Sequence, residues 1–114
     1  DEFGLQELLD KCGDLLAEEE VAREKKIMER FFKQFMENPK KIVYGEKETI
    51  QALERNAVRE LLLSESLPED RIFELEEQAQ KGGAEVKIIS VETREGVQLR
   101  DLGGIAGILR YEME

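Results

Sequence analysis

The stretch from Glu95 to Tyr111 constrains the fold of this chain more than any other part of the sequence. Its first half, up to Leu102, mixes apolar and charged residues as a short amphipathic helix does. Gly103 and Gly104 then end the helix, because glycine adopts positive φ without a clash of Cβ. Residues 105–111 form a strand pattern with apolar side chains on both sides. We therefore predict a strand that is covered on both faces.

Strand and helix patterns alternate in the middle of the chain. We expect strands at residues 41–44, 59–63 and 85–91, and helices at residues 46–55 and 71–81. Asn56 stands where the first of these helices ends, a position that suits a left-handed residue. Strands that alternate with helices predict a largely parallel or mixed sheet with helices on its faces.

Two helices are expected before this α/β region. The first is predicted from an apolar stripe at helical spacing, formed by Leu5, Leu8, Leu9, Cys12, Leu15 and Leu16. Within that stripe, Cys12 is interpreted as a small core residue rather than a reactive thiolate. Glutamates 18–20 are predicted to open the second helix, because negative charge is favourable at a helix N-terminus. Asn38 and Pro39 are expected to end it.

The charge balance restricts the class of partner. Twenty-seven acidic and seventeen basic residues give a net charge of −10. Nucleic-acid binding depends on neutralising phosphates, so direct binding of nucleic acid by this chain is not expected. A protein partner with a basic face fits the acidic charge better.

The sequence carries no constellation that predicts catalysis. It has no histidine and a single cysteine, and Gly103 and Gly107 are not followed by the residues of a phosphate-binding loop. We therefore expect no enzyme activity and no cofactor. One cysteine cannot form an internal disulfide, which favours a cytoplasmic protein. No apolar run has the length of a membrane span, so no membrane partner is expected.

Several motifs give the chain a resemblance to a known family. The run from Glu95 to Tyr111, which closes with Gly-Gly-Ile-Ala-Gly-Ile-Leu-Arg-Tyr, resembles the end of the C-terminal domain of the class-1 translation release factors of archaea and eukaryotes. Other segments similar to that domain follow in its order, beginning at Gly4, Glu24, Val43, Gln51, Asn56 and Leu61. The resemblance covers essentially residues 1–114, which we expect to form a single domain.

Pelota, a related family that acts on stalled ribosomes, ends in a similar way. It shares the Tyr-Gly, Ala-Val and Gly-Gly-Ile pieces of this sequence. The segments that begin at Gly4 and Glu24 are more similar to the release factors, which favours that family. A Pelota-like ribosome rescue factor is the alternative.

The resemblance implies both a fold and a function. The implied fold is a three-layer α/β/α sandwich with a mixed four-stranded sheet, similar to kink-turn-binding ribosomal proteins and here preceded by two N-terminal helices. The implied function is translation termination, in which this domain docks a translational GTPase (elongation factor 1 alpha or a class-2 release factor) and the ribosome-recycling ABC ATPase. Contact with the ribosome is expected through the full-length protein. A kink-turn-type RNA-binding module is the competing function, and the acidic charge opposes it.

The resemblance places partner-binding residues in two regions. These are the segment Gly107, Ile108, Leu109, Arg110 and Tyr111, and the second predicted helix with Lys25, Lys26 and Arg30. Ile108 and Leu109 also fit the core, whereas Arg110 and Tyr111 are of types enriched at interface hot spots. For the three helix cations, a solvated helix face is the alternative interpretation.

One departure from the family affects metal binding. Many members have a longer insertion after the second strand, sometimes with paired cysteines suited to zinc. This chain has only Ser66 to Asp70 in that place. No such subdomain and no metal site are therefore expected.

Overall fold

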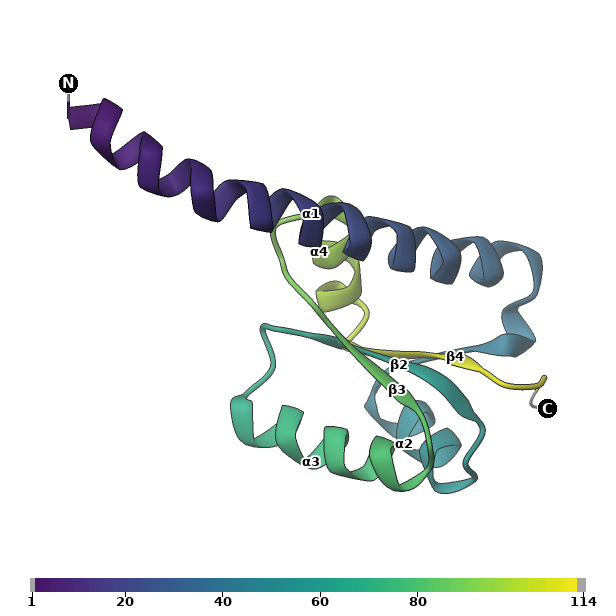
Figure 1. The fold of residues 1–114 in the computed structure, drawn as a ribbon. Helices are drawn as coiled ribbons and strands as arrows, with labels where there is room; N and C mark the ends of the chain where they lie inside the picture. Colours follow the sequence, from purple (N-terminus) through teal and green to yellow (C-terminus); the bar gives the residue numbers. More distant parts are fainter. Residues whose placement is uncertain (1, 113–114) are drawn as a thin grey trace.

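The computed structural model describes the backbone of residues 2–112 and the side chains of residues 18–112. These residues form an α/β domain with four helices and a four-stranded sheet (Figure 1). In chain order the elements are α1 (Glu2–Glu37), a 3-10 turn η1 (Pro39–Lys41), β1 (Ile42–Tyr44), α2 (Glu46–Glu54), β2 (Val58–Ser64), α3 (Glu69–Lys81), β3 (Glu85–Ile89), α4 (Arg94–Asp101) and β4 (Ile105–Leu109).

The sheet is mixed, one of the two arrangements predicted from the alternation and the one that the family resemblance implies. Its strand order is β1-β4-β2-β3. Strand β4 pairs antiparallel with both β1 and β2, and β2 pairs parallel with β3. All five residues of β4 are buried, which confirms the prediction of a strand covered on both faces. The strand ends at Leu109, two residues before the predicted end.

Helices lie on both faces of the sheet (Figure 1). On one face, α1 and α4 pack over a cluster that includes Met28, Phe31, Leu62 and Leu99. On the other face, α2 and α3 pack over a second cluster, formed by buried residues such as Ala52, Leu53, Leu61, Leu63, Leu75 and Ala79. Neighbouring residues of β2 contribute to opposite clusters because successive side chains of a strand point to opposite faces.

The prediction of two N-terminal helices is wrong. A single helix, α1, runs from Glu2 to Glu37. Residues 17–20 are alanine and glutamate, which are strong helix formers, and no proline, glycine or typical N-cap residue interrupts residues 15–21. Nothing therefore ends one helix and starts another at the three glutamates. The predicted leucine stripe and the burial of Cys12 lie outside the described side chains.

The predicted turn residues have the backbone conformation that their types favour. Asn56 has φ of 56°, and Gly103 and Gly104 have φ of 112° and 79°. The glycine pair lets the chain leave α4 and enter β4 directly, with the Gly104 amide donating to the carbonyl of Leu99.

Arg110, which directly follows β4, anchors the end of this strand to the start of β2 and to the end of α3. Its backbone amide donates to the Ala57 carbonyl at 2.8 Å. Its Nε donates to the Val58 carbonyl at 3.2 Å, and its Nη2 donates to the carbonyls of Gly82 and Gly83 at 3.1 and 2.8 Å. The last two carbonyls directly follow α3, where a cation is also favoured by the helix dipole.

No helix among the described residues is long and apolar enough to cross a membrane.

Replacing Arg110 with alanine is expected to destabilise the fold. The Arg110→Ala variant loses three hydrogen bonds from a charged donor, and we expect the free energy of unfolding to fall by about 2 kcal/mol. Urea unfolding followed by circular dichroism measures this change. Arg55→Ala is the matched control, because the described residues offer Arg55 no side-chain hydrogen bond or ion pair. Equal stability of the two variants would contradict the anchoring role.

Gly96 in the first turn of α4 is expected to tolerate no side chain. A Cβ there would lie 1.8 Å from the Ser90 carbonyl oxygen, whereas a Cβ at Gly82 would meet only the movable end of the Asn56 side chain. Alanine normally stabilises a helix relative to glycine, but this clash reverses the sign. Gly96→Ala should lower the free energy of unfolding by about 2 kcal/mol more than Gly82→Ala in the same urea experiment. Unchanged stability of Gly96→Ala would disprove the close approach.

Candidate protein-docking surface

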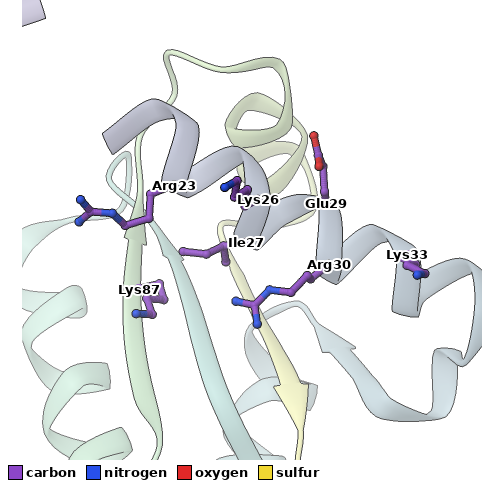
Figure 2. A pocket seen from close by; sticks show the side chains of 7 residues that line it. All are labelled: Arg23, Lys26, Ile27, Glu29, Arg30, Lys33 and Lys87. Atoms are coloured by element: carbon purple, nitrogen blue, oxygen red, sulfur yellow. The ribbon is translucent and has the colours of Figure 1, made fainter. Parts of the chain in front are cut away.

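A basic groove lies between α1 and the sheet, although the chain as a whole is strongly acidic. Its volume is about 580 Å³. Five of its seven lining residues are cationic, and the lining consists of Arg23, Lys26, Ile27, Glu29, Arg30, Lys33 and Lys87. Figure 2 shows Arg23, Ile27 and Arg30 directed from α1 toward the strands, with Lys87 on β3 below them in this view.

Helical spacing places the α1 cations in one row. Arg23, Lys26, Arg30 and Lys33 are separated by three, four and three residues, so they share one side of the helix. The adjacent residue Ile27 is only 7% exposed and lies against the sheet. Burial of this apolar neighbour holds the cationic row beside the sheet.

Arg30 has a structural partner inside the domain. Its Nη2 lies 3.2 Å from Oε1 of Glu60, a carboxylate that is only 5% exposed. Oε2 of Glu60 has no hydrogen-bond partner among the described residues. A buried carboxylate needs a counter-charge, so Arg30 stabilises the fold as well as lining the groove.

Lys87 is held in place by its strand neighbour. Its Nζ lies 2.9 Å from Oε1 of Glu85. A hydrogen bond from Lys87 and the charge of its ammonium group hold the pKa of the Glu85 carboxyl below its ordinary value. Glu85 is therefore ionised at neutral pH and positions the Lys87 ammonium group at the edge of the sheet.

Besides the basic groove, a smaller hollow lies between α1 and the C-terminal strand β4. It has a volume of about 230 Å³ and is lined by Arg30, Lys33, Gln34, Lys41, Arg59, Glu60, Ile108 and Leu109. Three predicted partner-binding residues, Arg30, Ile108 and Leu109, therefore meet at one place. The side chains of Ile108 and Leu109 are buried in the core clusters on opposite faces of the sheet, and Ile108 is the one on the α1 face.

The other predicted partner-binding residues lie in different settings. Gly107 is buried in β4, and a Cβ there would lie within 3.4 Å of Val43 and Val58 atoms. Lys25 is exposed but does not line the groove that contains Lys26. Arg110 is engaged with backbone carbonyls, as described above. Tyr111 retains 51% exposure, which leaves its ring accessible to a partner.

Sequence reasoning did not assign Arg23, Lys33, Lys41, Arg59 or Lys87 to a site. The three-four-three spacing of the α1 cations was a signal that could have identified Arg23 and Lys33. The other cations come from η1, β2 and β3, and only the folded sheet brings them near α1.

Within residues 18–112, no group of three or more acidic, cysteine or histidine side chains is arranged to hold a metal ion. The chemistry available on this surface is the binding of negatively charged groups, together with apolar contact at Ile27.

Comparison with known proteins assigns the family. A family model described as eRF1 domain 3 matches residues 21–113. Peptide chain release factor subunit 1 of Thermococcus sibiricus is 35% identical over 160 residues, covering 99% of this chain and 39% of that protein. A Pelota homologue of Methanopyrus kandleri is 36% identical over 121 residues, covering 98% of this chain and 34% of that protein.

The fold comparison points to the same domain. The structure of the C-terminal domain of the peptide chain release factor from Methanosarcina mazei matches with a TM-score of 0.80 and 30% identity, covering 97% of this chain and 96% of that one. The chain spans about two fifths of the length of the curated release factors that it matches. These findings confirm the resemblance carried by the motifs from Gly4 to Tyr111. The chain belongs to the eRF1 domain 3 family, the non-catalytic C-terminal domain of peptide chain release factors, to which Pelota is a related homologue.

Proposed function

We propose that this chain is the protein-interaction domain of a class-1 release factor that acts in translation termination. The observation that carries this proposal is the near-complete mutual coverage with the Methanosarcina mazei release factor domain. The domain is non-catalytic, so its contribution to termination is the binding of other proteins. The chain spans about two fifths of the release factors that it matches, and neither stop-codon reading nor peptide release is proposed for it.

The proposed partners are a translational GTPase of the elongation factor 1 alpha or class-2 release factor type, and a ribosome-recycling ABC ATPase. Two solved relatives support this proposal. A model of ribosome-bound archaeal Pelota and ABCE1 matches this chain with 30% identity and a TM-score of 0.73. Saccharomyces cerevisiae Dom34, described as interacting with Hbs1, matches with 25% identity and a TM-score of 0.75.

Tyr111 is the residue that we propose for direct contact with the GTPase. It is half exposed, it directly follows the anchored Arg110, and it is of a type enriched at interface hot spots. Lys25, Lys26 and Arg30 are proposed to add electrostatic contacts from α1. Gly107, Ile108 and Leu109 support this surface from beneath, because they are buried.

A Pelota-like rescue factor is the second candidate. The observation that favours it is length: the Methanopyrus kandleri Pelota homologue aligns over 121 positions, close to the 114 residues of this chain. The Thermococcus sibiricus release factor aligns over 160 positions, so it carries residues that this chain lacks within the matched region. We infer that the short connection Ser66 to Asp70 accounts for part of this difference.

Removal of the Tyr111 ring is expected to weaken docking without unfolding the domain. Calorimetric titration with archaeal elongation factor 1 alpha, loaded with a non-hydrolysable GTP analogue, should show binding of the parent chain. Tyr111→Ala should weaken it by about thirtyfold, the effect of losing a hot-spot side chain. Circular dichroism checks that the variant is folded.

Phe73→Ala is the matched control for this titration, because Phe73 is an aromatic residue that is 62% exposed on α3. It should bind like the parent chain. Absence of binding by the parent chain would contradict GTPase docking by this domain alone. Equal binding of Tyr111→Ala and the parent chain would contradict the proposal that Tyr111 contacts the GTPase.

A further inference from the structure

The sheet has one open edge of appreciable length. Strand β3 is hydrogen-bonded only to β2, which leaves its other side unpaired among the described residues. The opposite edge strand, β1, has three residues, whereas β3 has five. An open edge presents a row of backbone N–H and C=O groups that can pair with an added strand.

A hollow runs along this edge. It has a volume of about 220 Å³ and is lined by Glu20, Arg23, Glu24, Ile27, Val86, Lys87 and Ile88. Four of the lining residues come from α1 and the other three are consecutive residues of β3, so the hollow lies between α1 and the edge strand. It shares Arg23, Ile27 and Lys87 with the basic groove under α1.

The two faces of β3 have different chemistry at this edge. Ile89 belongs to the cluster under α1 and Val86 packs against the cluster under α3, so strand alternation places Lys87 on the α1 face and Ile88 on the α3 face. The α1 face therefore offers Lys87, whose ammonium group is paired with Glu85 on the same face, and Arg23 lies beside it in the groove. The α3 face offers Ile88, which is 40% exposed.

We propose that the open edge of β3 binds an extended acidic segment of a partner protein, which adds to the sheet as a fifth strand. In such a segment acidic and apolar residues alternate. The acidic residues lie on the α1 face against Lys87 and Arg23, and the apolar residues lie on the α3 face against Val86 and Ile88. Backbone hydrogen bonds supply affinity and the alternation supplies specificity, as in other strand-addition complexes.

A peptide fits this edge better than a nucleic acid does. The residues that line the basic groove and the hollow along β3 include no aromatic ring on which a base can stack. Glu20 and Glu24 lie beside the edge and repel the acidic residues of a peptide as they repel phosphates, so charge alone does not separate the two ligands. The exposed apolar side chain of Ile88 has no counterpart in a sugar–phosphate chain but matches an apolar residue of a peptide.

This surface is separate from Tyr111, although Lys26 and Arg30, which are also proposed to contact the GTPase, line the same basic groove as Arg23 and Lys87. Tyr111 follows β4, and β2 lies between β4 and β3 in the sheet. Strand addition at β3 therefore does not rest on GTPase docking at Tyr111. The Tyr111→Ala variant should bind the acidic segment like the parent chain.

The experiment uses a short synthetic peptide in which glutamate and valine alternate. Titration into isotopically labelled protein, followed by NMR, should shift the amide signals of residues 85–89 and slow their hydrogen exchange. Lys87→Glu and Arg23→Glu, each checked for folding by circular dichroism, should weaken binding by about tenfold or more. Lys47→Glu on α2 is the matched charge reversal away from the edge, and it should bind nearly like the parent chain.

Two further ligands separate strand addition from simple charge attraction. The same peptide with alternate backbone amides N-methylated keeps every side chain but cannot pair with β3, and it should not bind. A single-stranded oligouridylate should bind more weakly than the alternating peptide. Equal binding of the N-methylated peptide, tighter binding of the oligouridylate, or no binding of the alternating peptide would each overturn the proposal. If Lys87→Glu does not fold, the Arg23→Glu variant tests whether cations at this edge bind the acidic residues of the peptide.

Discussion

The packing of α1 on the sheet is the contact on which the rest of the surface depends. Met28 and Phe31 lose all solvent exposure there, beneath the same helix that carries Arg23 and Arg30 on its flank. Burial of each such side chain contributes about 1.5–3 kcal/mol, which fixes the rotation of the helix about its own axis. Once that rotation is fixed, the cationic row lines the groove beside the sheet while its side chains stay exposed to solvent. The position of the cations in the basic groove thus depends on the apolar contacts of Met28 and Phe31, which do not line that groove.

The α/β part of the fold was predictable because its signals are local. Asn56 and the pair Gly103-Gly104 mark turns by their own backbone preference, and the apolar residues of β4 mark a strand with two covered faces. The number of N-terminal helices was not predicted correctly, because the three glutamates were taken as a start signal although they also continue a helix well. The role of the Arg110 side chain was not predictable, because the Gly82 and Gly83 carbonyls reach it only after α3 has packed.

The candidate groove shows why total charge is a poor guide to a local surface. With a net charge of −10, the whole chain repels anions at long range, yet five cations line one groove. Charges further apart than about 8–10 Å are largely screened at physiological salt, so a partner in contact responds mainly to the groove. The sequence could not reveal this grouping in full, since Lys87 joins the α1 cations only through the order of the strands. Long-range repulsion and local attraction together favour a partner that presents a few carboxylates over a uniformly charged polyanion.

The place of β4 in the strand order also governs when the domain can fold during synthesis. Strand β4 is the last of the four strands to be made, yet it lies between β1 and β2 and joins them. Until residues 105–109 leave the ribosome, β1 has no partner strand, and only the parallel pair β2–β3 can form. Parallel pairing across a helix is slow and weak on its own, so the nascent chain exposes apolar surface until its final strand arrives. The fold of this domain is thus completed only by the last strand to be made.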